Sequence, residues 1–163
     1  MEAVLALHLA EPVGWALRDG AGGPRSGTLR LSRSGPGAAL AEFRHWLQRR
    51  LAETPCWALA FEAPWTGPRS GPELARLLIG LASVVEMTAR EADVPRLLPA
   101  NNLAVRRHFL GRGWGRQAEL RRLTAERCRA LGWTPANDSE AAAQALLHWA
   151  LAQGQTLREA ADA

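Results

Sequence analysis

The order of short apolar runs and turn-forming residues in the first 32 positions constrains the fold more than any other feature of this sequence. Three segments have strand length and composition: Glu2–Leu9, Val13–Arg18 and Gly27–Ser32. Turn formers separate the second from the third, Asp19-Gly20 and the Gly/Pro-rich stretch 22–26. Connections this short join antiparallel strands. We therefore expect an antiparallel three-stranded meander at the start of the chain.

The rest of the chain alternates between helical and strand-like segments. Helical spacing of apolar residues, or capping signals, predicts five helices: Ala38–Ala52, Pro72–Arg90, Asn101 or Asn102 to Phe109, Arg116–Leu131, and near Asn137 to about Gln153. Two further strands lie among them, Cys56–Phe61 and Val94–Leu98. Because strands joined through helices usually run parallel, this order predicts an α/β fold with a mixed five-stranded sheet flanked by helices.

A chain of 163 residues with 47% hydrophobic and 22% charged residues is expected to form one soluble domain. We expect that domain to span residues 1–153, followed by a short frayed tail, 154–163. The sequence contains no apolar run of membrane-spanning length and no basic leader, so we expect a cytoplasmic protein with no membrane partner. Cys56 and Cys128 have no metal-type spacing and are expected to be buried, reduced thiols.

Positive charge is concentrated in one segment. All 20 basic residues are arginine, and the stretch 96–132 holds nine of them against two glutamates, a local balance of +7. The remainder has eleven arginines against fourteen acids, a balance of −3. A basic segment on a mildly acidic body is typical of a protein that binds a polyanion. The alternative is a solvated helix face in a protein whose coding bias favours arginine.

Polar side chains stand at the ends of three apolar elements: His8, Glu62 and the start of the last helix at Asp138, Ser139 and Glu140. If the first and fourth strands are neighbours, His8 and Glu62 come close together, and the last helix can bring its first turn beside them. Acidic clusters of this kind hold the paired Mg²⁺ ions of phosphodiester chemistry.

Four stretches, in this order and spacing, resemble the RuvC-type Holliday-junction resolvases, closest to their phage-like branch, within the RNase H-like superfamily. They are Leu7–Ala16 (LHLAEPVGWA), Ala58–Glu62 (ALAFE), Pro99–Asn102 with Val105–Gly113, and Cys128–Trp133 with Pro135 and Asn137–Leu147. The resemblance runs from Val4 to about Ala150. It implies an RNase H-like fold and descent from a metal-dependent crossover junction endodeoxyribonuclease. It also implies that Glu62 is the retained catalytic acid.

Two positions depart from the family pattern. The first aspartate of the family falls on His8, and the aspartate of its last helix falls on Ala142. Histidine is a poor Mg²⁺ ligand and suits Mn²⁺ or Zn²⁺ better. Of the acids that remain, Glu62 is aligned with a catalytic position, while Asp138 and Glu140 could join it as metal ligands only if the geometry permits.

The resemblance and its departures together predict a catalytically degenerate site of Glu62, His8, Asp138 and Glu140, with no bound cofactor. Three alternatives stay open: an active nuclease that uses Mg²⁺ or Mn²⁺, an alignment shift that brings Glu11 or Asp138 into the site, and a non-catalytic assembly or packaging factor. His8 could also be an ordinary hydrogen-bonded histidine at a strand end.

The resemblance also implies a partner, branched DNA such as a four-way junction. Seven residues of the basic segment are predicted to contact it: Arg106, Arg107, Arg112, Trp114, Arg116, Arg121 and Arg122. Trp114 could stack on an unpaired base, or it could pack within its own loop. The family builds its dimer interface on the helix predicted at Pro72–Arg90, so we expect a homodimer.

Overall fold

The computed structural model describes residues 2–64 and 71–161, with side chains described up to residue 156. Its five strands are β1 (Ala3–His8), β2 (Val13–Arg18), β3 (Arg25–Leu29), β4 (Cys56–Glu62) and β5 (Arg96–Ala100). Its helices are α1 (Pro36–Glu53), α2 (Pro72–Glu91), α3 (Asn102–Leu110), α4 (Gln117–Ala130) and α5 (Asp138–Ala161). Within the described residues, no helix is both long and apolar enough to cross a membrane.

The strands form one mixed sheet in the order β3-β2-β1-β4-β5. The first three strands pair antiparallel, as the short turns between them predict. β4 and β5 are reached through helices and pair parallel, β4 against β1 and β5 against β4. The expected mixed five-stranded sheet and N-terminal meander are confirmed.

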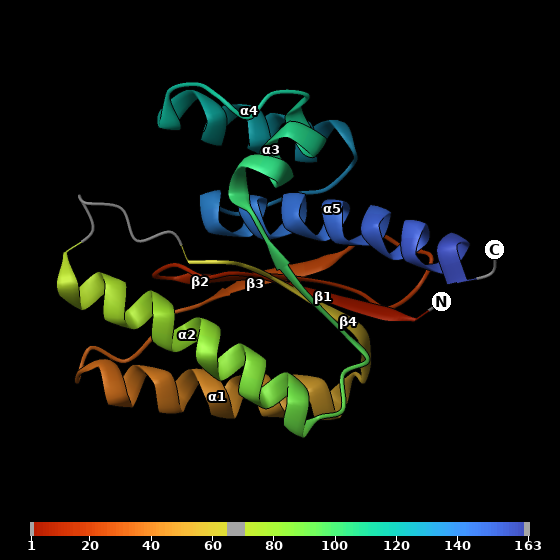
Figure 1. Cartoon of the computed structure of the whole chain (residues 1–163). Coiled ribbons are helices and arrows are strands. Elements are labelled where there is room, and N and C mark those ends of the chain that lie inside the picture. Colours follow the sequence, from red (N-terminus) through yellow and green to blue (C-terminus); the bar gives the residue numbers. More distant parts are fainter. Residues whose placement is uncertain (1, 65–70, 162–163) are drawn as a thin grey trace.

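Helices cover both faces of the sheet (Figure 1). α1 and α2 pack against one face, while α5 crosses the other face with α3 and α4 on its outer side. Alternate residues of β1 point to the two sides: Leu5 and Leu7 belong to the core under α1 and α2, and Val4 and Ala6 to the core under α5. Each face therefore has its own hydrophobic core.

α5 packs closely against the sheet at positions where the residues between them are small. The sheet face beneath it carries alanines from four strands, and α5 contributes Ala141, Ala143 and Ala145. Gly14 of β2 marks the closest approach, since a Cβ at that position would lie 2.0 Å from the backbone oxygen of Ser139. This close packing fixes the start of α5 beside the edge of the sheet where β1 ends.

Three element boundaries differ from the sequence-based expectation. β5 lies at Arg96–Ala100 rather than Val94–Leu98, and it includes Pro99, which an edge strand tolerates because one side of it has no partner strand. β3 starts at Arg25, inside the stretch expected to be a turn. α5 continues to Ala161, so the frayed tail expected from residue 154 is helical to that point; Gly154 lets the helix lie against Trp57.

Candidate functional site

The parallel pairing of β1 with β4 brings His8 and Glu62 together. In the β1–β4 register Leu7 lies opposite Phe61, so the next residue of each strand emerges at the same edge of the sheet. Nδ1 of His8 lies 2.6 Å from Oε2 of Glu62. The side chains are 22% and 13% exposed, so the pair is largely withdrawn from water. The predicted proximity of these two residues is confirmed.

The protonation of His8 is set by opposing effects. Burial disfavours the charged imidazolium, and the Arg106 guanidinium also opposes it. The Glu62 carboxylate favours it through its charge and its hydrogen bond, and this effect prevails, so the pKa of His8 is raised above its ordinary value. The pair is therefore an ion pair over a wider pH range than an isolated histidine would allow.

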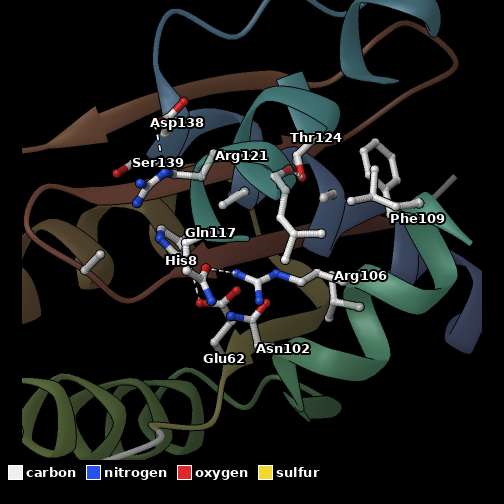
Figure 2. Close-up of a pocket in the computed structure, with 16 residues that line it drawn as sticks. His8, Glu62, Asn102, Arg106, Phe109, Gln117, Arg121, Thr124, Asp138 and Ser139 are labelled. Atoms are coloured by element: carbon white, nitrogen blue, oxygen red, sulfur yellow. Dashed lines mark hydrogen bonds and ion pairs between the residues drawn. The ribbon is translucent and has the colours of Figure 1, made fainter. Parts of the chain in front are cut away.

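His8 and Glu62 lie in the wall of a cavity of about 350 Å³ between the sheet edge and helices α3, α4 and α5. Its polar lining includes side chains from all three helices: Asn102 and Arg106 of α3, Gln117, Arg121 and Thr124 of α4, and Asp138 and Ser139 of α5 (Figure 2). Phe109, Leu110 and Leu120 supply apolar surface. Polar groups gathered around one concave, partly apolar surface are typical of a ligand site.

α5 contributes an acid and an alanine to this cavity. Asp138 and Ala142 both line it, as helix residues four apart should. Oδ2 of Asp138 lies 3.7 Å from Nε of Arg121, and both side chains are more than half exposed. At Ala142, where the resemblance expects an aspartate, the lining offers only a methyl group.

Glu140, in contrast, does not line the cavity. It is 8% exposed, and its carboxylate accepts hydrogen bonds from the Ser26 hydroxyl at 2.6 Å and from the backbone N–H of Ala136 at 3.2 Å. Asn137, rather than Asp138 or Ser139, caps the helix by accepting from the N–H of Glu140 at 3.0 Å. Glu140 thus ties the start of α5 to β3, which corrects the expectation that it belongs with His8 and Glu62.

Glu11 is also placed elsewhere. Its carboxylate accepts from the backbone N–H of Leu31 at 3.3–3.4 Å, and it is absent from the residues that line the cavity. Of the two acids that a shifted alignment could bring to the site, the structure therefore places only Asp138 there.

The donor set does not fit a pair of divalent ions. Two such ions need several carboxylates to offset their mutual repulsion. Here Glu62 is already bonded to His8, Asp138 faces a guanidinium, and Arg106 and Arg121 add positive charge to the same wall. Among the residues described, no cluster of three or more histidine, cysteine or acidic side chains could hold a metal.

The predicted DNA-binding residues are all on α3, α4 and the loop between them. We call the six arginines of this set the α3–α4 arginine surface: Arg106, Arg107, Arg112, Arg116, Arg121 and Arg122. Three pair with acids, namely Arg112 with Glu119 and Arg122 with Glu126, each at 2.6 Å, and Arg121 with Asp138. Arg107 and Arg116 are exposed and form no ion pair with any described residue. Trp114 is 75% exposed, which excludes the alternative that it packs within its loop.

Several contacts at and near the site were not predicted from the sequence. Asn102 and Gln117 reach the cavity because each begins a helix at its rim, a placement that no spacing pattern signals. His108 and His148 bond to each other, Nε2 to Nδ1 at 3.0 Å, across α3 and α5, although they are 40 positions apart. The capping choice left open at the start of α3 is resolved in favour of Asn101, whose Oδ1 accepts from the N–H of Leu103 at 2.8 Å.

No protein-family model matches the sequence, and neither does any curated protein. Solved structures do. RuvC from Thermus thermophilus superposes with a TM-score of 0.69 at 18% identity, over 89% of this chain and 90% of that one. The same protein in complex with a Holliday junction substrate gives 0.70 at 19% identity, over 90% of this chain and 91% of that one. The chain therefore has a RuvC-like, RNase H-like α/β fold, which confirms the expected fold class.

Proposed function

We propose that this protein binds branched DNA of the four-way junction type through the α3–α4 arginine surface and does not cleave it by two-metal chemistry. The observation that carries the proposal is the position of that surface: it adjoins the His8–Glu62 cavity, in a fold shared with RuvC from Thermus thermophilus, whose structure is known in complex with a Holliday junction substrate. Nine arginines against two glutamates over residues 96–132 supply the charge that a phosphate backbone attracts.

The absence of cleavage rests on the chemistry of the cavity. A histidine and an alanine stand where the resemblance expects metal-binding aspartates, and Glu62 is engaged by His8. Arg106 and Arg121 bring positive charge to the place where divalent ions would need carboxylates.

The exposed Trp114 adds a feature suited to a branched substrate. It stands in a glycine-containing loop between Arg112 and Arg116. An indole at the surface can stack on a base that is unpaired at a branch point, which linear duplex does not offer.

We also propose that the protein acts as a homodimer that pairs through α2. Leu74, Ile79 and Met87 of this helix are 46%, 50% and 43% exposed. Apart from Trp114, they are the large apolar side chains exposed to solvent among the described residues. A two-fold dimer matches the symmetry of a four-way junction. Sedimentation at micromolar concentration tests this: Ile79→Glu should convert a dimer to a monomer, and a wild-type monomer contradicts the proposal.

The binding test compares a four-way junction with linear duplex of the same length in a gel-shift titration over several salt concentrations. We expect tighter binding to the junction and an affinity that falls steeply with salt. Trp114→Ala should reduce the preference for the junction more than the affinity for duplex. Weak, salt-insensitive binding that is equal for both DNAs would contradict the proposal and favour a protein-interaction role.

A second candidate, an active metal-dependent endonuclease, is favoured by one observation: Glu62 and Asp138 are two carboxylates in the same cavity. Incubating the junction with Mg²⁺ or Mn²⁺ distinguishes the two. Cleavage that disappears in Glu62→Gln would establish the nuclease, whereas we expect intact junction in both samples.

A further inference from the structure

Two guanidinium groups line the same cavity as His8 and Ala142, the positions where the resemblance expects metal-binding aspartates. Arg106 reaches into the cavity from α3 and Arg121 from α4 (Figure 2). Nη2 of Arg106 donates to Oε1 of Gln117 at 2.9 Å. Arg121 faces Asp138 at the longer distance of 3.7 Å.

Arg106 differs from most of the other arginines of the surface in its partner. Its hydrogen bond goes to a neutral amide, and it forms no ion pair with any part of the chain that the structure describes. Of the two carboxylates in the wall, that of Glu62 is bonded to His8 and that of Asp138 faces Arg121. Because Arg106 is half-buried while keeping unused N–H donors, its charge is poorly compensated by either water or an acid.

A half-buried guanidinium of this kind favours an anion. Charge-assisted hydrogen bonds from arginine to phosphate are stronger than neutral ones and can be bidentate. Neutral donors stand in the same lining: the side-chain amides of Asn102 and Gln117 and the hydroxyl group of Ser139. The cavity volume, about 350 Å³, is within the range of about 300–1,000 Å³ usual for small-ligand sites.

We propose that this cavity binds a phosphodiester group of the DNA directly through Arg106, with Arg121 as a second contact, so that guanidinium groups take the place of divalent ions. The proposal rests on the branched-DNA function argued above and adds to it the site and the group recognised. It explains together why carboxylates are missing at His8 and Ala142 and why arginines line the same wall: the positive charge that a phosphate needs comes from the chain itself.

The test measures junction binding with excess EDTA and with Mg²⁺ for three variants. Arg106→Gln removes the guanidinium from the cavity. Arg107→Gln removes the guanidinium of the next residue of α3, which is exposed and outside the cavity. Arg49→Gln removes an exposed guanidinium of α1, on the opposite face of the sheet. We expect wild-type binding to be equal with EDTA and Mg²⁺, a loss of about tenfold for Arg106→Gln, a loss of about threefold for Arg107→Gln, and no change for Arg49→Gln. Arg106→Lys should recover part of the loss, because it restores charge without the planar fork.

A second measurement locates the phosphate. Titration with the dinucleotide dTpdT, followed by NMR, should shift the ring signals of His8 and the side-chain amide signals of Gln117 in the wild type but not in Arg106→Gln. Circular dichroism of each variant verifies that the fold is kept.

The outcomes separate this inference from the proposed function. Junction binding that requires Mg²⁺, or that is the same in Arg106→Gln and Arg107→Gln, would overturn the cavity proposal and leave junction binding in place. A wild-type protein that binds neither the junction nor dTpdT would overturn both.

Discussion

Nδ1 of His8 and Oε2 of Glu62 lie 2.6 Å apart at the ends of two parallel neighbouring strands, in the wall of a cavity that Arg106 and Arg121 also line. The contact gives the Glu62 carboxylate a partner within the chain. Glu62 is thereby neutralised by a side chain rather than left to attract a cation.

The first prediction concerns the stability of this pair. Glu62→Gln removes the charge that compensates a buried imidazolium, so we expect a loss of about 1–3 kcal/mol in the free energy of unfolding at pH 6. Urea denaturation measures it. Glu86→Gln, at an exposed position of α2 on the far side of the sheet, should change stability by less than about 0.5 kcal/mol. Equal effects of the two substitutions would mean that the His8–Glu62 contact contributes nothing to folding.

The second prediction concerns the pH dependence of the same pair. The pKa of His8 is raised in the folded protein, because Glu62 outweighs the effect of burial. The stabilisation it provides is therefore complete below the unfolded pKa of about 6.5 and is lost as pH rises through the folded value. NMR titration of the ring should give a midpoint above 6.5, and Glu62→Gln should move it down past that of a free histidine, since burial and the Arg106 guanidinium then lower the pKa unopposed. A midpoint unaffected by Glu62→Gln contradicts this account.

The third prediction concerns His148, whose pKa moves in the opposite direction. Burial, then His108 and Arg127, lower the pKa of His148. Its neutral ring bonds to His108 and packs beside Phe109 and Trp133. Because the unfolded chain takes up the proton more readily, this residue makes stability fall as pH drops below about 6.5. His148→Gln should flatten that decline in urea titrations between about pH 5 and pH 7, and an unchanged decline would assign it to other groups.

Particular residues illustrate how far the sequence determined the site. The sequence placed His8 and Glu62 at the ends of two strands, and we expected them to meet only if those strands are neighbours. The structure shows that β1 and β4 pair in parallel, so the two strands end at a common edge. Glu140 was harder to place. It is two residues from Ala142 and on another face of α5, and whether it met Glu62 or Ser26 depended on how the helix is rotated over the sheet. That rotation is fixed by alanine and glycine contacts far apart in the sequence, which leave no local signal.

Those contacts give the fourth prediction. A Cβ at Gly14 would lie 2.0 Å from the backbone oxygen of Ser139. Because the clashing atoms belong to the backbone of α5, the clash cannot be relieved by rotating a side chain. We expect Gly14→Ala to destabilise the fold by about 1–3 kcal/mol or more and to displace the first turn of α5. Gly20→Ala is the matched control, because a Cβ there meets nothing within 4 Å. Thermal unfolding of both variants measures the difference, and a Gly14→Ala protein as stable as Gly20→Ala would contradict the close approach of β2 to α5.

The last prediction concerns aspartates introduced at the two positions where the resemblance expects them. His8 and Ala142 line the same cavity as Glu62 and Asp138, so the double variant His8→Asp with Ala142→Asp would place four carboxylates around it. We expect Mn²⁺ at a concentration of about 100 times its Kd to stabilise this variant by ~2.7 kcal/mol, a rise in Tm of several degrees. The control, His8→Asn with Ala142→Asn, has the same shape without the added charge and should show no such rise. If the Asp variant keeps its fold but its Tm is insensitive to Mn²⁺, the two positions do not face a common metal site, and the alignment that links them to lost catalytic acids is wrong.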